Sequence, residues 1–572
     1  MRILLLSHAY NSLTQRLDAE LRALGHTVTV ELDIADAVTE EAVALFRPDV
    51  LVAPYLRRAI PASVWSRLPC LVVHPGIVGD RGPSALDWAI TLQESTWGVT
   101  VLQAEAEMDA GPIWATQEFP LRMAAKASLY RNEVTQAASQ AVLQALDAWS
   151  KGQAPMPLAQ WQGARGQLRP LMKQDDRRID WAVDSTATVL RKLRAADSFP
   201  GVADTLFGQP CHLFDACEEA LELDSAAAPG TLLARRETAL LRRTVDGAVW
   251  IGHVKRAGSI KLPATLAFEV ESAALPELPL EGWWRAAQAT WQDIAYEEDG
   301  AVGKLHFGFY NGAMSTRQCQ RLQAALAWAK QRAVRVLVLA GGADFWSNGI
   351  HLNVIEAASL GEGSAADESW DNINAMNDLT LELINTPAQL TVAALGGNAG
   401  AGGCFLARAA DQVWVRSGVM LNPHYKNMGN LYGSEYWTYL LPKRVGLDKA
   451  QAIMRNREPL TAQASVSLGL YDACLDGERA AFVQDVQARA QALAKASDWA
   501  QQLERKNAQR AQDEAAKPLA DYRLEELAHM RRNFYGFDPS YHVARHHFVH
   551  KSLASWTPRH LARHRELTGA LV

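Results

Sequence analysis

The chain opens with a strand, a helix and a second strand in close succession, and this pattern constrains its fold more than any other feature. Residues 2–8 form a short apolar run. Residues 13–24 mix polar and apolar positions as a helix does, and Gly25 ends that helix before another apolar run at 28–32. Two strands joined by a helix are the unit of an α/β sheet. The opening lacks the G-x-G-x-x-G pattern of a dinucleotide site, so we expect a parallel sheet with some other ligand beyond its strand ends.

The length of the chain predicts several domains, because 572 residues are too many for one hydrophobic core. A Gln-, Gly- and Pro-rich stretch at 150–169 marks one boundary, and Pro276–Pro279 lies in a linker. Short strand-like segments between them are typical of a small β-barrel, and a second α/β series follows. We expect an α/β domain at 1–165, a small barrel at 166–275, a linker at 276–300, and an α/β domain with C-terminal helices at 301–572.

Composition argues against several classes of function. The net charge of -6 gives no electrostatic signal for DNA or RNA. No run of 18 apolar residues predicts a membrane span, and the N-terminal apolar run is too short for a signal peptide. The six cysteines are scattered without a C-x-x-C pair, which fits buried thiols in a reducing compartment. We expect a cytoplasmic protein that acts on small molecules and binds neither nucleic acid nor membrane.

A histidine cluster lies near the C-terminus. His546 and His550 are four residues apart, which puts both imidazoles on one face of a helix, and His547 lies between them. No cysteine or carboxylate set nearby in the sequence completes a metal shell. We therefore expect a surface histidine cluster and no metal site.

The first chemical motif runs from His74-Pro75-Gly76, at the end of an apolar strand, through Arg81-Gly82 to Asp109-Ala110-Gly111. Acyl transfer passes through a tetrahedral intermediate, which needs a donor for the oxyanion and a group that handles the nucleophile's proton. A histidine with an aspartate nearby is the minimum for that chemistry. Either residue alone is more typical of a structural histidine or of a turn.

Taken in order, and with Gly98-Val99-Thr100 between them, these motifs resemble the folate-dependent formyltransferase family. The resemblance covers about residues 1–120 and continues at 173–181 and 194–201, which are similar to that family's OB-like C-terminal barrel. It implies a Rossmann-like domain that binds 10-formyl-tetrahydrofolate, with His74 and Asp109 catalytic. The loop at 53–61 would lie beside the pterin, and the expected folate contacts are Ala53, Tyr55, Ile60, Arg81 and Gly82.

One position departs from that family's pattern. Its catalytic asparagine stands two residues before the histidine, where this chain has Val72, and valine cannot hydrogen-bond a formyl oxygen. Two interpretations stay open: Gln103 or Ser84 replaces the asparagine, or the acceptor is not an ordinary amine. A thiol acceptor would need less help from a base, because thiols ionise at about pH 8.5 and amines at about pH 10.

The second chemical motif consists of two glycine-rich stretches, 341–352 and 396–404. Glycine lets a backbone N–H approach a ligand closely, and two such donors can hold one thioester carbonyl. The pair resembles the crotonase (enoyl-CoA hydratase/isomerase) family over roughly residues 300–480. It implies a crotonase-like α/β domain that binds coenzyme A. The expected oxyanion donors are the N–H groups of Ile350 and Gly402, with Gly403 beside them.

The acid and base of the hydratases are missing from this chain. Two glutamates act in that family, and the matching positions hold Phe405 and His424. The segment 422–439 nevertheless carries hydroxyls, an imidazole and a carboxylate. We expect Tyr425 and Glu435 to be the base and its partner, with His424 as a third candidate. A carboxylate in a mostly aromatic pocket would have a raised pKa and could exchange a proton near neutral pH.

The combination of these two halves closely resembles one family of hydrogenase-maturation proteins, and segments 74–90 and 431–446 carry that resemblance. It implies a relay in which formyl passes from 10-formyl-tetrahydrofolate to coenzyme A. Formyl-CoA is then split into CO and CoA, and the CO becomes a ligand of the nickel–iron hydrogenase, whose maturation proteins are candidate partners. Two alternatives stay open: a formyltransferase that acts on a CoA-linked or nucleotide-sugar substrate without CO release, and a non-catalytic scaffold.

Overall fold

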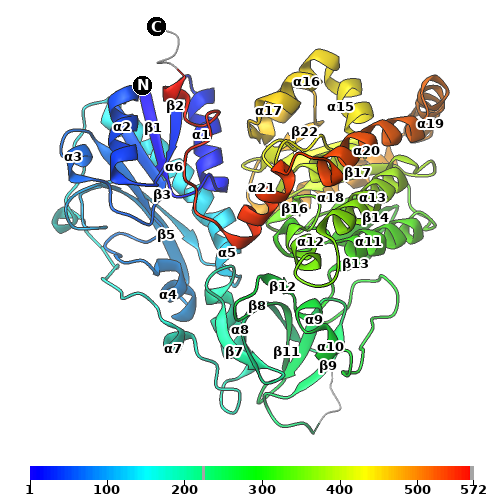
Figure 1. Cartoon of the computed structure of the whole chain (residues 1–572), viewed down its shortest axis with the longest axis horizontal. Helices are drawn as coiled ribbons and strands as arrows, with labels where there is room; N and C mark the ends of the chain where they lie inside the picture. The colour runs from blue at the N-terminus through cyan, green and yellow to red at the C-terminus, as the bar shows by residue number, and fades with distance from the viewer. Residues whose placement is uncertain (222–225, 567–572) are drawn as a thin grey trace. The chain divides into compact units, whose positions relative to one another are not determined.

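The computed structural model describes residues 1–221 and 226–566, which form two compact units (Figure 1). Unit 1 comprises residues 1–278 together with the segment from Leu553, and unit 2 comprises Pro279–Ser552. Each unit has a hydrophobic core of its own.

Unit 1 begins with a six-stranded sheet that confirms the strand–helix–strand opening. Side chains alternate between the two faces of a strand, so Ile3 and Leu5 pack with the helices α1 and α6, while Leu4 and Leu6 pack with α2. The first four strands of this sheet are parallel, and the last two are antiparallel to their neighbours. The strand order is β2-β1-β3-β4-β5-β6, with bounds β1 Arg2–Ser7, β2 Thr27–Leu32, β3 Val50–Tyr55, β4 Cys70–His74, β5 Thr96–Gln103 and β6 Ile113–Pro120, and with α1 Ser12–Ala23, α2 Asp36–Phe46 and α6 Thr135–Ser150.

The second part of unit 1 is an antiparallel sheet within the stretch where a small barrel was predicted. The described strands pair in the order β7-β8-β11-β10-β9, and β12 pairs with β11. That order is an open sheet, so closure into an OB-like barrel stays a prediction. The bounds are β7 Val202–Leu206, β8 Gln209–Glu219, β9 Leu232–Arg236, β10 Ala239–Arg243, β11 Ala248–Arg256 and β12 Lys261–Pro263.

Unit 2 is built on a mainly parallel sheet covered on both faces. Leu337 and Leu339 pack against α11 and α13, while Val336 and Val338 pack against α18. The main sheet has the order β13-β14-β15-β17-β19-β22, with bounds β13 Ile294–Asp299, β14 Val302–Phe307, β15 Val336–Ala340, β17 Leu390–Leu395, β19 Gln412–Arg416 and β22 Ala473–Leu475. The three helices are α11 Thr316–Ala329, α13 Ala365–Ile384 and α18 Arg479–Lys495.

A smaller sheet follows the carboxyl ends of the main strands of unit 2. Its order is β16-β18-β20-β21, and the bounds are β16 Phe345–Ser347, β18 Asn398–Gly400, β20 Met420–Asn422 and β21 Leu460–Thr461. The helices α19 Trp499–Ala516, α20 Leu519–Tyr535 and α21 Ser540–His550 end the unit. Because both glycine-rich stretches follow main-sheet strands, the small sheet brings them to the same edge of the fold.

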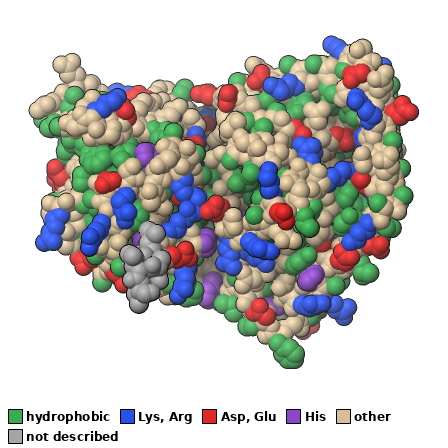
Figure 2. All heavy atoms as spheres, turned by 90° about the horizontal axis from the view of Figure 1, so that it is seen from above, with side chains coloured by type: hydrophobic (Ala, Val, Ile, Leu, Met, Phe, Trp, Pro, Cys, Tyr) green, Lys and Arg blue, Asp and Glu red, His purple; other side chains and the backbone are tan. Residues whose placement is uncertain are grey.

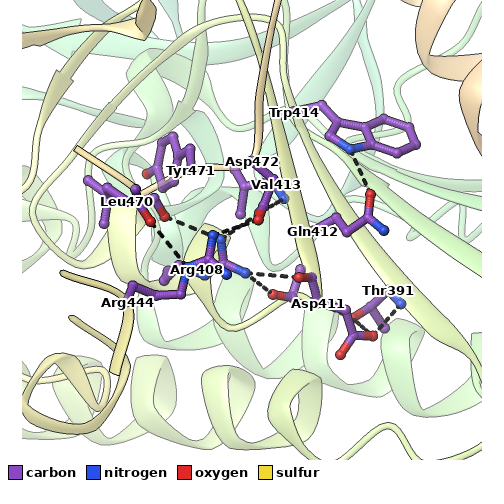
Figure 3. Close-up of polar contacts among 12 residues, drawn as sticks. Thr391, Arg408, Asp411, Gln412, Val413, Trp414, Arg444, Leu470, Tyr471 and Asp472 are labelled. Atoms are coloured by element: carbon purple, nitrogen blue, oxygen red, sulfur yellow. Dashed lines mark hydrogen bonds and ion pairs between the residues drawn. The ribbon is translucent and has the colours of Figure 1, made fainter. Parts of the chain in front are cut away.

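Helix α14, Gly402–Arg408, is fixed at its C-terminal end by the polar network in Figure 3. Arg408 donates to Asp472 at 2.7 Å and to the carbonyl oxygens of Ala410 and Asp411 at 2.7 and 3.0 Å. The carboxylate of Asp411 accepts the N–H and the hydroxyl of Thr391 on β17, at 2.7 and 2.9 Å. The network holds α14 against β17 and so sets the position of its first residue.

The C-terminal segment departs from the expected division, which assigned residues 301–572 to one domain. Residues 553–566 belong to unit 1, where the carbonyl oxygen of Leu561 accepts the N–H of Val30 at 3.0 Å. The buried His564 and Glu31 lie 3.0 Å apart, from Nε2 to Oε2. Burial alone would raise the pKa of Glu31, but hydrogen bonds from His564, Thr557 and Arg565 hold it below its ordinary value.

The described helices include none that is long and apolar enough to cross a membrane. On the face seen in Figure 2, basic and acidic side chains are interspersed with hydrophobic ones. This mixture agrees with the modest net charge of the sequence.

We expect His564→Ala to lower the free energy of unfolding by about 1–3 kcal/mol, because Glu31 would stay buried with one partner fewer. Urea denaturation at neutral pH measures the loss. The partners hold the pKa of Glu31 below its ordinary value, so their stabilisation is present above that value and disappears as the pH falls and the carboxylate protonates. The difference between wild type and variant should therefore shrink in acid.

The matched control is Arg565→Ala, because this guanidinium also contacts Glu31 but its side chain is 30% exposed. A loss from His564→Ala no larger than the loss from Arg565→Ala would contradict the importance of the buried imidazole.

Candidate functional site

The first group of polar side chains lies in unit 1, where β4 ends. His74 is the last residue of that strand and is 4% exposed. Its Nε2 lies 2.9 Å from Oδ2 of Asp80, and its Nδ1 lies 3.6 Å from Oδ1 of Asp109. The two residues predicted from the sequence therefore lie together, and Asp80 joins them from within the same motif, although the prediction did not include it.

Glycines allow the loops to come this close to the imidazole. A side chain at Gly76 would begin 2.4 Å from Nε2 of His74, and one at Gly111 would begin 1.8 Å from the carbonyl oxygen of Gln103. Asp109 itself adopts a left-handed conformation, φ 56°, and accepts the N–H of Gly82 at 3.3 Å. Only glycine fits at 76 and 111, which explains the residue pattern of both motifs.

A buried arginine forms an ion pair with Asp80. Nε of Arg169 lies 3.4 Å from Oδ1 of Asp80, on the side away from His74. An imidazole held between two carboxylates is oriented for proton transfer. The group can therefore accept a proton from a nucleophile and return it to a leaving group.

The other residues predicted for unit 1 lie on β3 or in the loops that follow β3 and β4. Gly82 contacts Asp109 directly, and its neighbour Arg81 forms an ion pair with Glu107 at 2.7 Å. On β3, the hydroxyl of Tyr55 accepts Nε of Arg57 at 3.1 Å. Ala53 and Ile60 are buried in one apolar cluster beside this strand, and neither presents a polar group there.

Gln103 and Ser84, the two residues that could replace the family asparagine, each already make a hydrogen bond within the fold. Val72 pairs with Ala53 on β3 and with Leu102 on β5. The side-chain oxygen of Gln103 accepts the indole N–H of Trp114 at 3.1 Å. The hydroxyl of Ser84 accepts the N–H of Met172 at 3.1 Å. Both alternatives therefore already make a bond within the fold.

The second group lies in unit 2, where the two glycine-rich stretches meet. A side chain at Gly349 would begin 3.5 Å from the backbone nitrogen of Gly402, so these stretches are in contact. Among the residues that the structure describes, no hydrogen bond occupies the N–H of Ile350 or Gly402. Gly402 begins α14, and the first N–H groups of a helix lack partners within it. Gly403 has a packing role, because a side chain there would begin 2.1 Å from the carbonyl oxygen of Ser347.

Tyr425 and Glu435 form a buried pair beside Gly402. The hydroxyl of Tyr425 donates to Oε2 of Glu435 at 2.5 Å. The other oxygen of Glu435 is only 2.4 Å from where a side chain at Gly402 would begin. The ring of Tyr425 stacks on Phe405, with centroids 5.7 Å apart and planes 11° from parallel. Phe405, which takes the place of the first hydratase glutamate, thus supports the tyrosine.

The environment of this pair changes the proton affinity of both groups. Burial raises the pKa of Glu435 to about 8, although the hydrogen bond from Tyr425 lowers it. Burial, together with the charge of Glu435, raises the pKa of Tyr425 well above its ordinary value. The carboxyl can therefore exchange a proton near neutral pH, while the tyrosine remains a donor.

Two residues that the sequence analysis missed hold the backbone at Glu435. Glu435 and Tyr436 both adopt left-handed conformations, with φ 59° and 58°. The side-chain oxygen of Asn377, on α13, accepts the N–H of Glu435 at 2.7 Å. The carboxylate of Glu526, on α20, accepts the N–H groups of Tyr436 and Thr438 at 2.9 and 2.8 Å. Strained turns of this kind persist where their surroundings hold them in place.

The third candidate, His424, is buried directly before Tyr425 and is 4% exposed. Its backbone N–H donates to the carbonyl oxygen of Asn422 at 2.8 Å. It stays a candidate beside the tyrosine–carboxylate pair.

Three family models match the chain. The model described as formyl transferase matches residues 28–146, and that of the formyl transferase C-terminal domain matches 171–270. The model described as enoyl-CoA hydratase/isomerase matches 304–557. Fold and sites together define the class: a Rossmann-like formyltransferase unit joined in one chain to a crotonase-like domain.

Two relatives match nearly the whole chain. The hydrogenase maturation factor HoxX of Bradyrhizobium diazoefficiens is 54% identical over 568 residues, which cover 99% of this chain and 97% of that protein. The crystal structure of HypX from Aquifex aeolicus in complex with tetrahydrofolic acid matches with a TM-score of 0.94 and 46% identity, over 99% of both chains. This chain therefore belongs to the family of hydrogenase maturation factors that includes HoxX and HypX.

A relative of the N-terminal part alone supports the same division. A methionyl-tRNA formyltransferase of Roseiflexus castenholzii is 34% identical over 246 residues, which cover 42% of this chain and 76% of that enzyme. The resemblance to a hydrogenase-maturation family that the sequence motifs indicated is confirmed.

We expect Gly402→Ala to displace the carboxyl of Glu435 and to destabilise unit 2 by about 1–3 kcal/mol, because the new methyl group overpacks a buried site. Urea denaturation measures the loss, and a crystal structure of the variant should show the bond between Tyr425 and Glu435 lengthened or broken. Gly361→Ala is the matched control, because nothing lies within 4 Å of its added carbon. Equal stability of the two variants would contradict the tight contact at Gly402.

Proposed function

We propose that this chain transfers the formyl group of 10-formyl-tetrahydrofolate to coenzyme A and then splits formyl-CoA into CO and CoA. The CO would supply the ligand for the nickel–iron centre of hydrogenase, in the cytoplasm and beside other maturation proteins. One observation carries the proposal. A single chain holds an imidazole between two carboxylates in a formyltransferase unit, and a buried tyrosine–carboxyl pair beside two backbone donors in a crotonase-like domain.

In the first step, His74 takes the proton from the thiol of coenzyme A as its sulfur attacks the formyl carbon. Asp80 and Asp109 stabilise the imidazolium that results. His74 then returns the proton to N10 of the folate as the carbon–nitrogen bond breaks, which leaves formyl-CoA and tetrahydrofolate. A thiol acceptor agrees with Val72, because a thiol needs less activation than an amine.

The folate itself would lie along β3 and the loop that contains Arg81 and Gly82. The proposed contacts are the backbone and side chains of Ala53, Tyr55, Ile60, Arg81 and Gly82. The HypX structure in complex with tetrahydrofolic acid supports a folate site in this family.

In the second step, the N–H groups of Ile350 and Gly402 hold the formyl oxygen of formyl-CoA, with Gly403 beside them. Ionised Glu435 removes the formyl proton, and the electron pair of the C–H bond stays on carbon. The carbon–sulfur bond breaks, its electron pair goes to sulfur, and the proton passes from Glu435 to the thiolate. The products are CO and CoA, so the step balances without an oxidant or reductant. Tyr425 orients the carboxylate through its short hydrogen bond.

We expect His74→Ala and Asp109→Ala each to slow consumption of 10-formyl-tetrahydrofolate by about 10²–10⁴-fold, because loss of a general acid–base group has that cost. The assay supplies folate donor and CoA, and measures tetrahydrofolate and headspace CO. Supplied formyl-CoA should still yield CO at the wild-type rate in both variants. His212→Ala, on β8 of the same unit, is the control. Near-normal folate turnover by either site variant would reject this assignment.

We expect Glu435→Gln and Tyr425→Phe to form formyl-CoA but not to decompose it. Product analysis with folate donor and CoA should show formyl-CoA accumulating without CO. Since the pKa of Glu435 is about 8 and its ionised form is the base, CO release from formyl-CoA by the wild type should rise with pH through that value.

Other outcomes separate the alternatives. Unchanged CO release by both variants would move the chemistry to His424 or elsewhere. Formyl-CoA without CO from the wild type would favour a formyltransferase that stops at the thioester. Absence of turnover at both sites would favour a scaffold.

A further inference from the structure

The histidine pair near the C-terminus meets a buried glutamate in unit 2. His546 and His550 lie one turn apart on α21, and Glu356 comes from α12, Leu352–Ala358. Oε1 of Glu356 lies 2.9 Å from Nδ1 of His546 and 3.0 Å from Nε2 of His550. The expectation of a surface histidine cluster without a metal site rested on the absence of a carboxylate set nearby in the sequence. The carboxylate comes from a helix 190 residues earlier in the chain.

We propose that Glu356, His546 and His550 form a binding site for one divalent transition-metal ion of the zinc type. Their three ligand atoms all lie within 4.8 Å of one another. Around a tetrahedral ion with bonds of about 2.0–2.1 Å, ligand atoms lie about 3.3 Å apart. The two nitrogen–oxygen distances therefore need to open by only a few tenths of an ångström. Imidazole nitrogen and carboxylate oxygen are ordinary ligands of such ions.

The carboxylate of Glu356 is already oriented for this role. Arg545 donates from Nε to Oε2 of Glu356 at 2.7 Å, which leaves Oε1 directed at the two imidazoles. A second partner that fixes a ligating carboxylate is a regular feature of metal sites. Arg545 also offsets part of the negative charge, so we expect weaker binding than at a site with an unpaired carboxylate.

The group is open to solvent on one side. The side chain of His546 is 56% exposed and that of His550 is 32% exposed, whereas Glu356 is 4% exposed. An ion can therefore enter from solvent without movement of the core, and water can fill its remaining position. Bound there, the ion would connect α12 to α21.

The test uses the full-length protein without an affinity tag, stripped with chelator and titrated with Zn²⁺ in a calorimeter. We expect one ion per chain in the wild type. His546→Ala and His550→Ala should each weaken binding at least about tenfold, since even loss of a group outside the ligand shell has that effect. His547→Ala is the matched control, because this histidine lies on the same helix but outside the group, and it should bind like the wild type.

Two further readouts separate a built site from surface binding. Co²⁺ should give a visible absorption band that His546→Ala lacks, and saturating Zn²⁺ should raise the melting temperature of the wild type and of His547→Ala but not of His546→Ala. Equal affinity for all three histidine variants would overturn the proposal, as would a wild type that binds no ion.

Discussion

A buried carboxylate must find donors, and both units are organised around this requirement. Glu31 and Glu356 are buried but each receives hydrogen bonds from histidine and arginine, so their pKa values lie below the ordinary value. Glu435 is buried to a similar degree and receives a tyrosine hydroxyl, and its pKa rises to about 8. Burial raises the pKa of all three carboxyls, and it prevails at Glu435, whereas the histidine and arginine partners of Glu31 and Glu356 outweigh it.

In the crotonase-like domain, no hydrogen bond among the described residues occupies the N–H groups of Ile350 and Gly402, and the polar side chains beside them stand at other positions than the hydratase glutamates. Phe405, at the position of a hydratase glutamate, stacks on Tyr425. The carboxyl group belongs instead to Glu435, which lies on a left-handed turn later in the chain. Asn377 and Glu526 hold that turn by its backbone N–H groups. The tyrosine–carboxyl pair therefore depends on α13 and α20 as well as on the glycine-rich stretches, and changes in either helix reach the pair through the backbone.

Sequence patterns predicted the features that depend on residues close together in the chain. The strand–helix–strand opening, the glycine-rich stretches and the His74 and Asp109 motifs all lie where periodicity and motif order indicated. Asn377, Glu526 and Glu356 were missed because their partners lie 58, 90 and 190 residues away. One signal was available: Glu526 shares the buried face of α20 with Leu519, Met530 and Phe534. A lone acid on an apolar face needs a buried partner, but the sequence does not say which one.

The return of residues 553–566 to unit 1 affects the order in which the protein can be completed. A ribosome releases β2 early, yet Thr557, His564 and Arg565, which contact the carboxylate of Glu31, follow it in the chain by 526 residues or more. Domains generally fold as units while the chain emerges. Unit 2 can therefore assemble first, and the buried carboxylate of Glu31 gains these partners only once residues 557–565 have been synthesised.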